Sequence, residues 1–115
     1  MRKKPKRSYL RRKADTLFSL YVRKRGKCEL QNKDSIVCNG NLQTMHVIGR
    51  ANMRLRYDES NVFCGCSAHH AYYTYHPFDF YEMVNREFPL IYKYVMKTRN
   101  QLVKINYEEV IEKFK

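Results

Sequence analysis

The chain has 115 residues, a formal net charge of +12 and 43% hydrophobic residues. A chain of this length suits one domain with a modest core and leaves too few residues for a second full domain. No apolar run is long enough to cross a membrane, and no apolar segment follows the basic N-terminus, so the sequence predicts neither a membrane span nor a secretory signal. The expected location is therefore the cytoplasm, without a membrane partner.

Positive charge is densest near the N-terminus, where residues 2–13 include many basic side chains and no acidic one. The excess continues into more ordered sequence at Arg50, Arg54 and Arg56. Basic surfaces favour polyanionic partners because each neutralised phosphate releases condensed counterions. Nucleic acid is the expected partner, and a solubilising tail is the alternative explanation for the terminal charge run.

The first part of the chain is predicted to be a basic disordered arm, a helix and a loop. The arm covers residues 1–8 and precedes a single domain over residues 9–115. From residue 9 to residue 25, apolar side chains recur on one face of a helix, which Gly26 can end. Residues 28–40 are rich in turn-forming side chains and should form a loop bracketed by two cysteines.

Two short strands are expected next, over residues 42–48 and 62–64, joined by a polar and basic connection over residues 49–60. Because the second strand returns beside the first, the pair should form a hairpin. Ser67 can then cap a helix that ends near Tyr75.

The rest of the chain is predicted to be helical. Pro77 and Pro89 each favour the start of a helix, and residues 106–114 combine a capping-box pattern with an apolar helical face. The sequence thus predicts an α+β fold. Its core, over about residues 28–76, would be the hairpin and one helix, supported by C-terminal helices over residues 77–115.

Cysteine and histidine spacing indicates a structural metal site. Cys66 and His69 are three residues apart at the predicted strand-to-helix junction, so both can reach one tetrahedral ion. Cys28 and Cys38 bracket a loop that could return two thiolates to the same place. We therefore expect a structural zinc ion bound by Cys28, Cys38, Cys66 and His69. The alternatives are a four-cysteine site, in which Cys64 replaces His69, and no metal at all.

A second site is expected around the next histidine. Adjacent helical residues differ by about 100° in direction, so His70 should face away from the zinc ligands and toward the strand that carries His46. A divalent cation such as Mg²⁺ or Mn²⁺, held by His70, would suit phosphodiester hydrolysis with His46 as the base that activates water. Asn61, at the end of the connection, should hydrogen-bond backbone groups and hold His46 in place.

At these residues the chain resembles the HNH endonucleases, which are also called ββα-metal or His-Me finger nucleases. It is similar to small phage-type members such as the lambda recombination nuclease group, over roughly residues 14–80. The matching segments are residues 17–23 with Cys28, residues 46–50, residues 56–61, and residues 66–74 with Pro77.

The resemblance implies a ββα-metal core and a metal-dependent DNA endonuclease, working in the bacterial host cytoplasm if a phage encodes it. It implies that His46 is the general base, that Asn61 organises the hairpin and that His70 binds the catalytic cation. Basic side chains beside this site, in the arm and at the start of the following helix would bind DNA. These are Arg50, Arg54, Arg56, Lys3, Lys4, Arg7, Arg11 and Arg12.

Two positions depart from the family pattern. Met45 stands where many members have an Asp or His as a second metal ligand, so His70 would be the only protein ligand of the catalytic ion, with His76 as a candidate helper. Nine residues separate Cys28 from Cys38, where a Cys-x2-Cys knuckle is common.

Two other functions are compatible with the same residues. One is a zinc-stabilised nucleic-acid-binding module without catalysis, in which His46 is only structural. The other is an RNA-binding protein, given the charge and the ten tyrosines. No small-molecule cofactor is expected, and the chain is expected to be a monomer.

Overall fold

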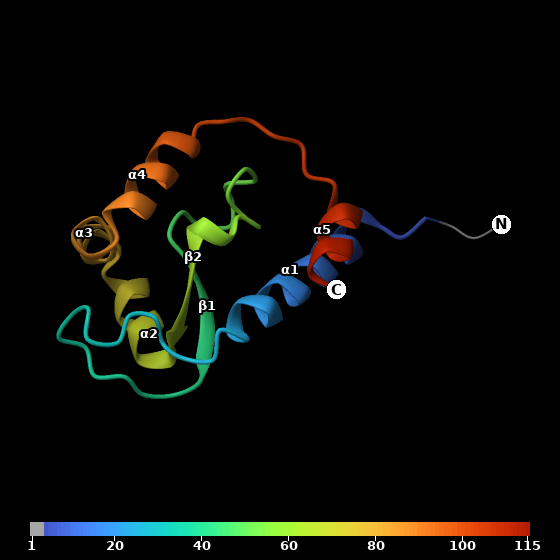
Figure 1. Cartoon of the computed structure of the whole chain (residues 1–115). Coiled ribbons are helices and arrows are strands. Elements are labelled where there is room, and N and C mark those ends of the chain that lie inside the picture. Colours follow the sequence, from blue (N-terminus) through green and yellow to red (C-terminus); the bar gives the residue numbers. More distant parts are fainter. Residues whose placement is uncertain (1–3) are drawn as a thin grey trace.

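The structure, a computed structural model, describes residues 4–115 and has the expected α+β composition. In this part of the chain, five α-helices surround an antiparallel hairpin of two strands (Figure 1). The predicted DNA contact Lys3 lies outside the described residues. None of the helices between residues 4 and 115 combines the length and the apolar character that a membrane crossing needs.

Helix α1 (Arg7–Arg23) begins two residues before its predicted start. Residues 4–6 have no regular secondary structure, but Arg7 and Ser8 belong to the helix, so the predicted arm over residues 1–8 is too long at its C-terminal end. The boundary is set at Lys6, the N-cap residue, whose backbone is extended (φ −63°, ψ 144°). The buried side chains of α1 are Ala14, Phe18 and Val22.

The hairpin consists of β1 (Leu42–His46) and β2 (Val62–Cys66), paired with Leu42 opposite Cys66 and His46 opposite Val62. Strand β1 ends two residues earlier than predicted, because the Ile48 amide bonds to the side chain of Asn61 rather than to a neighbouring strand. Strand β2 continues two residues further than predicted and leads directly into the next helix. A short 3-10 turn, η1 (Glu59–Asn61), precedes it.

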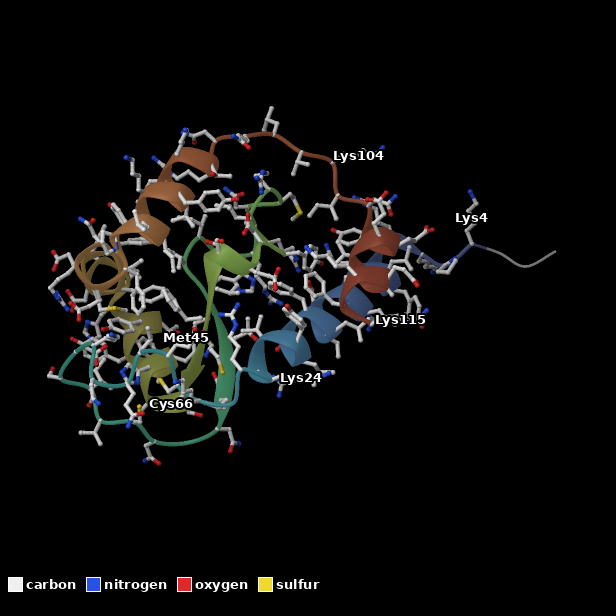
Figure 2. All side chains as sticks on the ribbon, viewed as in Figure 1. Lys4, Lys24, Met45, Cys66, Lys104 and Lys115 are labelled. Atoms are coloured by element: carbon white, nitrogen blue, oxygen red, sulfur yellow. The ribbon has the colours of Figure 1, made fainter. Side chains whose placement is uncertain are left out.

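Side chains of β1 alternate between two layers of the molecule. Thr44 faces α1, where its hydroxyl lies 3.1 Å from that of Ser19. His46 faces the same way, with its ring centroid 6.1 Å from that of Phe18. Met45 lies on the opposite side, in the interior beside α2 (Figure 2). This alternation follows from the two-residue period of a strand.

The helices divide into two groups on either side of the hairpin (Figure 1). Helices α2 (Ser67–Tyr75), α3 (Pro77–Glu87) and α4 (Pro89–Thr98) lie on one side, and α5 (Tyr107–Phe114) packs with α1 on the other. The predicted proline starts of α3 and α4 are confirmed, and the Asn106 side chain caps α5 by accepting the Glu109 amide at 3.2 Å. The hairpin thus separates two cores. One core contains Met45, Phe63, Met83, Val84 and Val95, and the other contains Phe18, Val22, Val62, Cys64 and Phe114.

Candidate functional site

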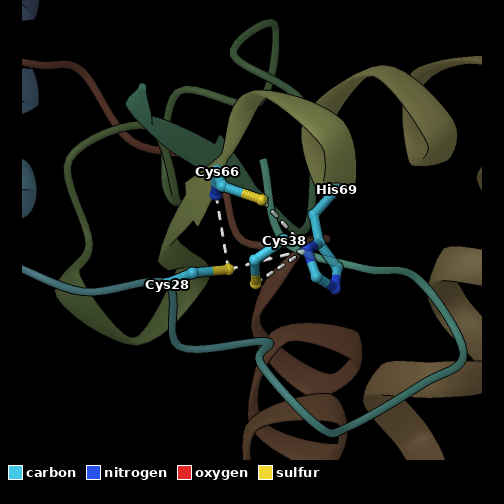
Figure 3. Close-up of side chains that lie close together, drawn as sticks. All are labelled: Cys28, Cys38, Cys66 and His69. Atoms are coloured by element: carbon cyan, nitrogen blue, oxygen red, sulfur yellow. Dashed lines mark hydrogen bonds between the residues drawn. The ribbon is translucent and has the colours of Figure 1, made fainter. Parts of the chain in front are cut away.

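Cys28, Cys38, Cys66 and His69 form a group that could hold one metal ion, because their ligand atoms all lie within 4.8 Å of one another. The three sulfurs lie 3.6, 3.7 and 3.2 Å from Nδ1 of His69 (Figure 3). In a tetrahedral zinc site with Zn–S about 2.3 Å and Zn–N about 2.0–2.1 Å, a sulfur and a nitrogen ligand are about 3.6 Å apart. The distances to Nδ1 are therefore close to those of a tetrahedral ligand set.

The position of Cys64 separates this ligand set from the four-cysteine alternative. Cys64 is fully buried in the core beside α1, with Phe18 and Val22, and is not part of the candidate metal group. Cys66 is the last residue of β2 and His69 lies in the first turn of α2, so the strand-to-helix junction brings these two side chains together. His69, rather than Cys64, completes the group.

Asp34 supports this group from outside it. Its Oδ1 atom lies 2.9 Å from Nε2 of His69 and also accepts the Ile36 amide, while its other oxygen accepts the Tyr73 hydroxyl. A carboxylate on one ring nitrogen places the proton there and leaves the lone pair of Nδ1 for a metal. Asp34 was not among the residues predicted from the sequence. The one sequence feature that could have indicated Asp34 is its position in the loop between Cys28 and Cys38.

A cleft of about 510 Å³ is lined by residues of α1, β1, α2 and the connection, and includes His46 and His70. His46 reaches it from β1 and His70 from α2. The polar and charged residues that line it, besides these two, are Asp15, Ser19, Arg23, Gln43, Thr44, Arg50 and Arg56. The lining contains three arginines and one aspartate, so its formal charge is positive and suits a phosphate group. Arg23 and Asp15, both on α1, were not among the predicted site residues.

His46 is oriented by the backbone of the connection. Its Nε2 atom lies 2.9 Å from the carbonyl oxygen of Arg56. A carbonyl oxygen can only accept, so Nε2 carries the proton and Nδ1 keeps a free lone pair. Burial lowers the pKa of His46 below its usual 6.5, and the positive charges of Arg50 and Arg56 act in the same direction. At neutral pH this imidazole is uncharged and can accept a proton.

Asn61 makes the backbone hydrogen bonds that the sequence analysis expected. Its side-chain oxygen accepts the Ile48 amide at 2.8 Å, and its amide nitrogen donates to the carbonyl oxygens of Ile48 and Leu55. The side chain is completely buried. Asn61 therefore holds the start of the connection, two residues after His46, against its end.

The three arginines of the connection have different surroundings. Arg56 is 8% exposed and donates to both carboxylate oxygens of Asp15, at 3.0 and 2.7 Å, and to the Arg50 carbonyl at 2.7 Å. The guanidinium of Arg56 is therefore bonded to other protein groups, whereas the sequence predicted that it would contact phosphate. The side chain of Arg50 is 61% exposed at the mouth of the cleft. Arg54 lies away from the cleft and is hydrogen-bonded to Asp58 and Gln101. The prediction that Arg54 lies beside the histidines is therefore wrong.

The described basic residues near the N-terminus also lie outside the cleft lining. Lys4, Arg11 and Arg12 are exposed, the last two on α1. Arg7 donates to the Ile105 carbonyl at 3.2 Å and lies 4.5 Å from the centre of the Tyr107 ring, which connects α1 to the segment before α5.

Met45 stands at the position where the resembled family often has a second ligand of the catalytic cation. Its side chain is 2% exposed and packs against Gly65, where an added Cβ would lie 2.2 Å from the methionine sulfur. Met45 is therefore a packing residue of the hairpin. The candidate helper His76 is exposed and stacks on Tyr72, with ring centroids 4.4 Å apart, and does not line the cleft.

No protein-family model matches the chain, and no curated protein or solved structure matches it either.

Proposed function

We propose that the protein is a metal-dependent endonuclease that hydrolyses phosphodiester bonds of DNA. The observation that carries this proposal is a neutral histidine, His46, which keeps a lone pair on Nδ1 and lines an arginine-containing cleft together with His70. A base with a free lone pair, a second imidazole able to bind a cation and positive charge for the phosphate are the groups that such a hydrolysis needs.

In the proposed reaction, the substrate phosphate lies in the cleft against Arg50 and Arg23. His46 takes a proton from a water molecule at Nδ1, and the water oxygen attacks phosphorus while the P–O bond to the leaving oxygen breaks. Arg56 keeps His46 in place through its carbonyl oxygen. A divalent cation, Mg²⁺ or Mn²⁺, held by His70 would supply positive charge for the phosphate and the leaving oxygen.

We also propose that Cys28, Cys38, Cys66 and His69 bind a structural zinc ion. Three thiolates and one imidazole are ligands that zinc prefers in closed tetrahedral sites, and Asp34 supplies the outer contact that such histidines usually have. All four ligands come from the protein, so the site leaves no position for substrate. Its role is to join the loop over residues 28–41 to the start of α2.

Plasmid nicking tests the nuclease proposal. The purified protein should convert supercoiled DNA to the open form with Mg²⁺ or Mn²⁺, and His46→Ala should slow this by about 100-fold or more, the usual contribution of a general base. His76→Ala is the matched control, because His76 is exposed and outside the cleft. Binding of DNA without any nicking would instead support a non-catalytic nucleic-acid-binding module.

A further inference from the structure

His70 contacts the side chain of Gln43, which has no role in the hydrolysis proposed above. Its Nδ1 atom is in hydrogen-bonding contact with Oε1 of Gln43, which precedes Met45 on the α2 side of β1. Both residues line the cleft. The direction of this hydrogen bond decides which ring nitrogen of His70 carries the proton, and so which one can bind a cation.

The orientation of the Gln43 amide follows from its other partner. The Ser67 hydroxyl donates to the backbone carbonyl of Asn41 at 3.1 Å, and that carbonyl can only accept. The hydrogen of Ser67 is therefore used, so the amide group that lies 3.2 Å from its oxygen must donate. This places Nε2 of Gln43 on Ser67 and Oε1 on His70.

An amide oxygen can only accept, so Nδ1 of His70 carries the proton and Nε2 keeps the lone pair. We propose that Gln43 is a positioning residue that fixes this tautomer of His70, so that Nε2 is the atom that binds the catalytic cation. This inference rests on the proposed function of His70. Hydrogen bonds of this kind raise ligand basicity and hold the ring in place.

The start of α2 fixes the far end of this chain of hydrogen bonds. Gly40 has φ +87°, and a Cβ on it would lie 2.6 Å from Cβ of Ser67, so only glycine lets the loop approach so closely. The Ala68 amide also donates to the Asn39 carbonyl at 3.0 Å. The same loop carries Cys38, so the cysteine group and the Gln43 contact share one support.

The test uses the full chain, loaded with zinc and labelled with ¹⁵N in its histidine rings. Above neutral pH the ring spectrum of the wild type should show the His70 proton on Nδ1. In Gln43→Leu this preference should be lost, and the Mn²⁺ concentration that half-broadens the His70 signals should rise about 10-fold or more. Gln43→Glu, which keeps an acceptor, should stay nearer to the wild type.

Gln101→Leu is the matched control, because Gln101 also accepts a side-chain hydrogen bond, from Arg54 at 3.1 Å, but is exposed and outside the cleft. A wild-type His70 protonated on Nε2 would overturn the inference, as would equal Mn²⁺ broadening in Gln43→Leu and Gln101→Leu. If Gln43→Leu does not fold, the wild-type tautomer decides. A proton on Nδ1 with Mn²⁺ bound at His70 but intact plasmid would support this inference while rejecting the proposed nuclease.

Discussion

His46 owes its uncharged state to its immediate surroundings. Burial is the largest cause of its lowered pKa, and the hydrogen bond to the Arg56 carbonyl and the negative charge of Asp15 only partly oppose it. Because the neutral form is the proposed base, cleavage should be slow at acid pH, rise as His46 loses its proton and reach a plateau. We expect the midpoint of this rise below pH 6.5. Rates over about pH 5 to 8 at saturating Mg²⁺ would measure it. A midpoint above the usual histidine value would argue against His46 as the base.

Asp15 holds Arg56, whose carbonyl oxygen in turn holds His46. The carboxylate is 20% exposed and also accepts the Tyr57 hydroxyl at 2.7 Å. Asp15→Ala leaves the buried guanidinium without its partner, so we expect a loss of about 2–4 kcal/mol in the free energy of unfolding, measured by denaturant titration. Glu112→Ala is the comparison, since its pair with Lys115 is largely exposed and should contribute less than about 1 kcal/mol. Equal losses in the two variants would mean that the Asp15 pair is not a structural link.

At the level of the elements, the close packing of β1 on β2 depends on Gly65. A methyl group there would meet the sulfur of Met45, which is buried and has little room to move. We expect Gly65→Ala to cost about 1–3 kcal/mol through overpacking. In a Met45→Ala background the same change should cost much less, because the space is then open. A double-mutant cycle of unfolding free energies measures this coupling, and additive effects would show that the two residues do not share the space.

The elements were more predictable from the sequence than the contacts between them. The helical period, the two prolines and the capping residue at position 106 are local signals, and α1, α3, α4 and α5 follow them. The ligand set at Cys66 and His69 was also readable, because the spacing and the strand-to-helix junction are local. Asp15, Asp34 and Gln43 were not, since each contacts a partner that lies far away in the sequence: Arg56, His69 and His70, respectively. The burial of Arg56 depends on α1 in the same way, and no pattern within residues 49–60 reports it.

For the whole molecule, the Cys28, Cys38, Cys66 and His69 group connects a loop without regular structure to the hairpin and to α2. Such a small chain has limited apolar burial, so a bound zinc ion should carry much of its stability, as in zinc-finger peptides, where binding contributes about 10–16 kcal/mol. We expect one zinc per chain and a large fall in the melting temperature on chelation. Cys38→Ala should lose the zinc, whereas Cys64→Ala should keep it, because Cys64 is buried in the other core. Zinc content by elemental analysis, together with thermal unfolding, distinguishes the two. Loss of zinc in Cys64→Ala with full retention in His69→Ala would instead identify the site as four thiolates.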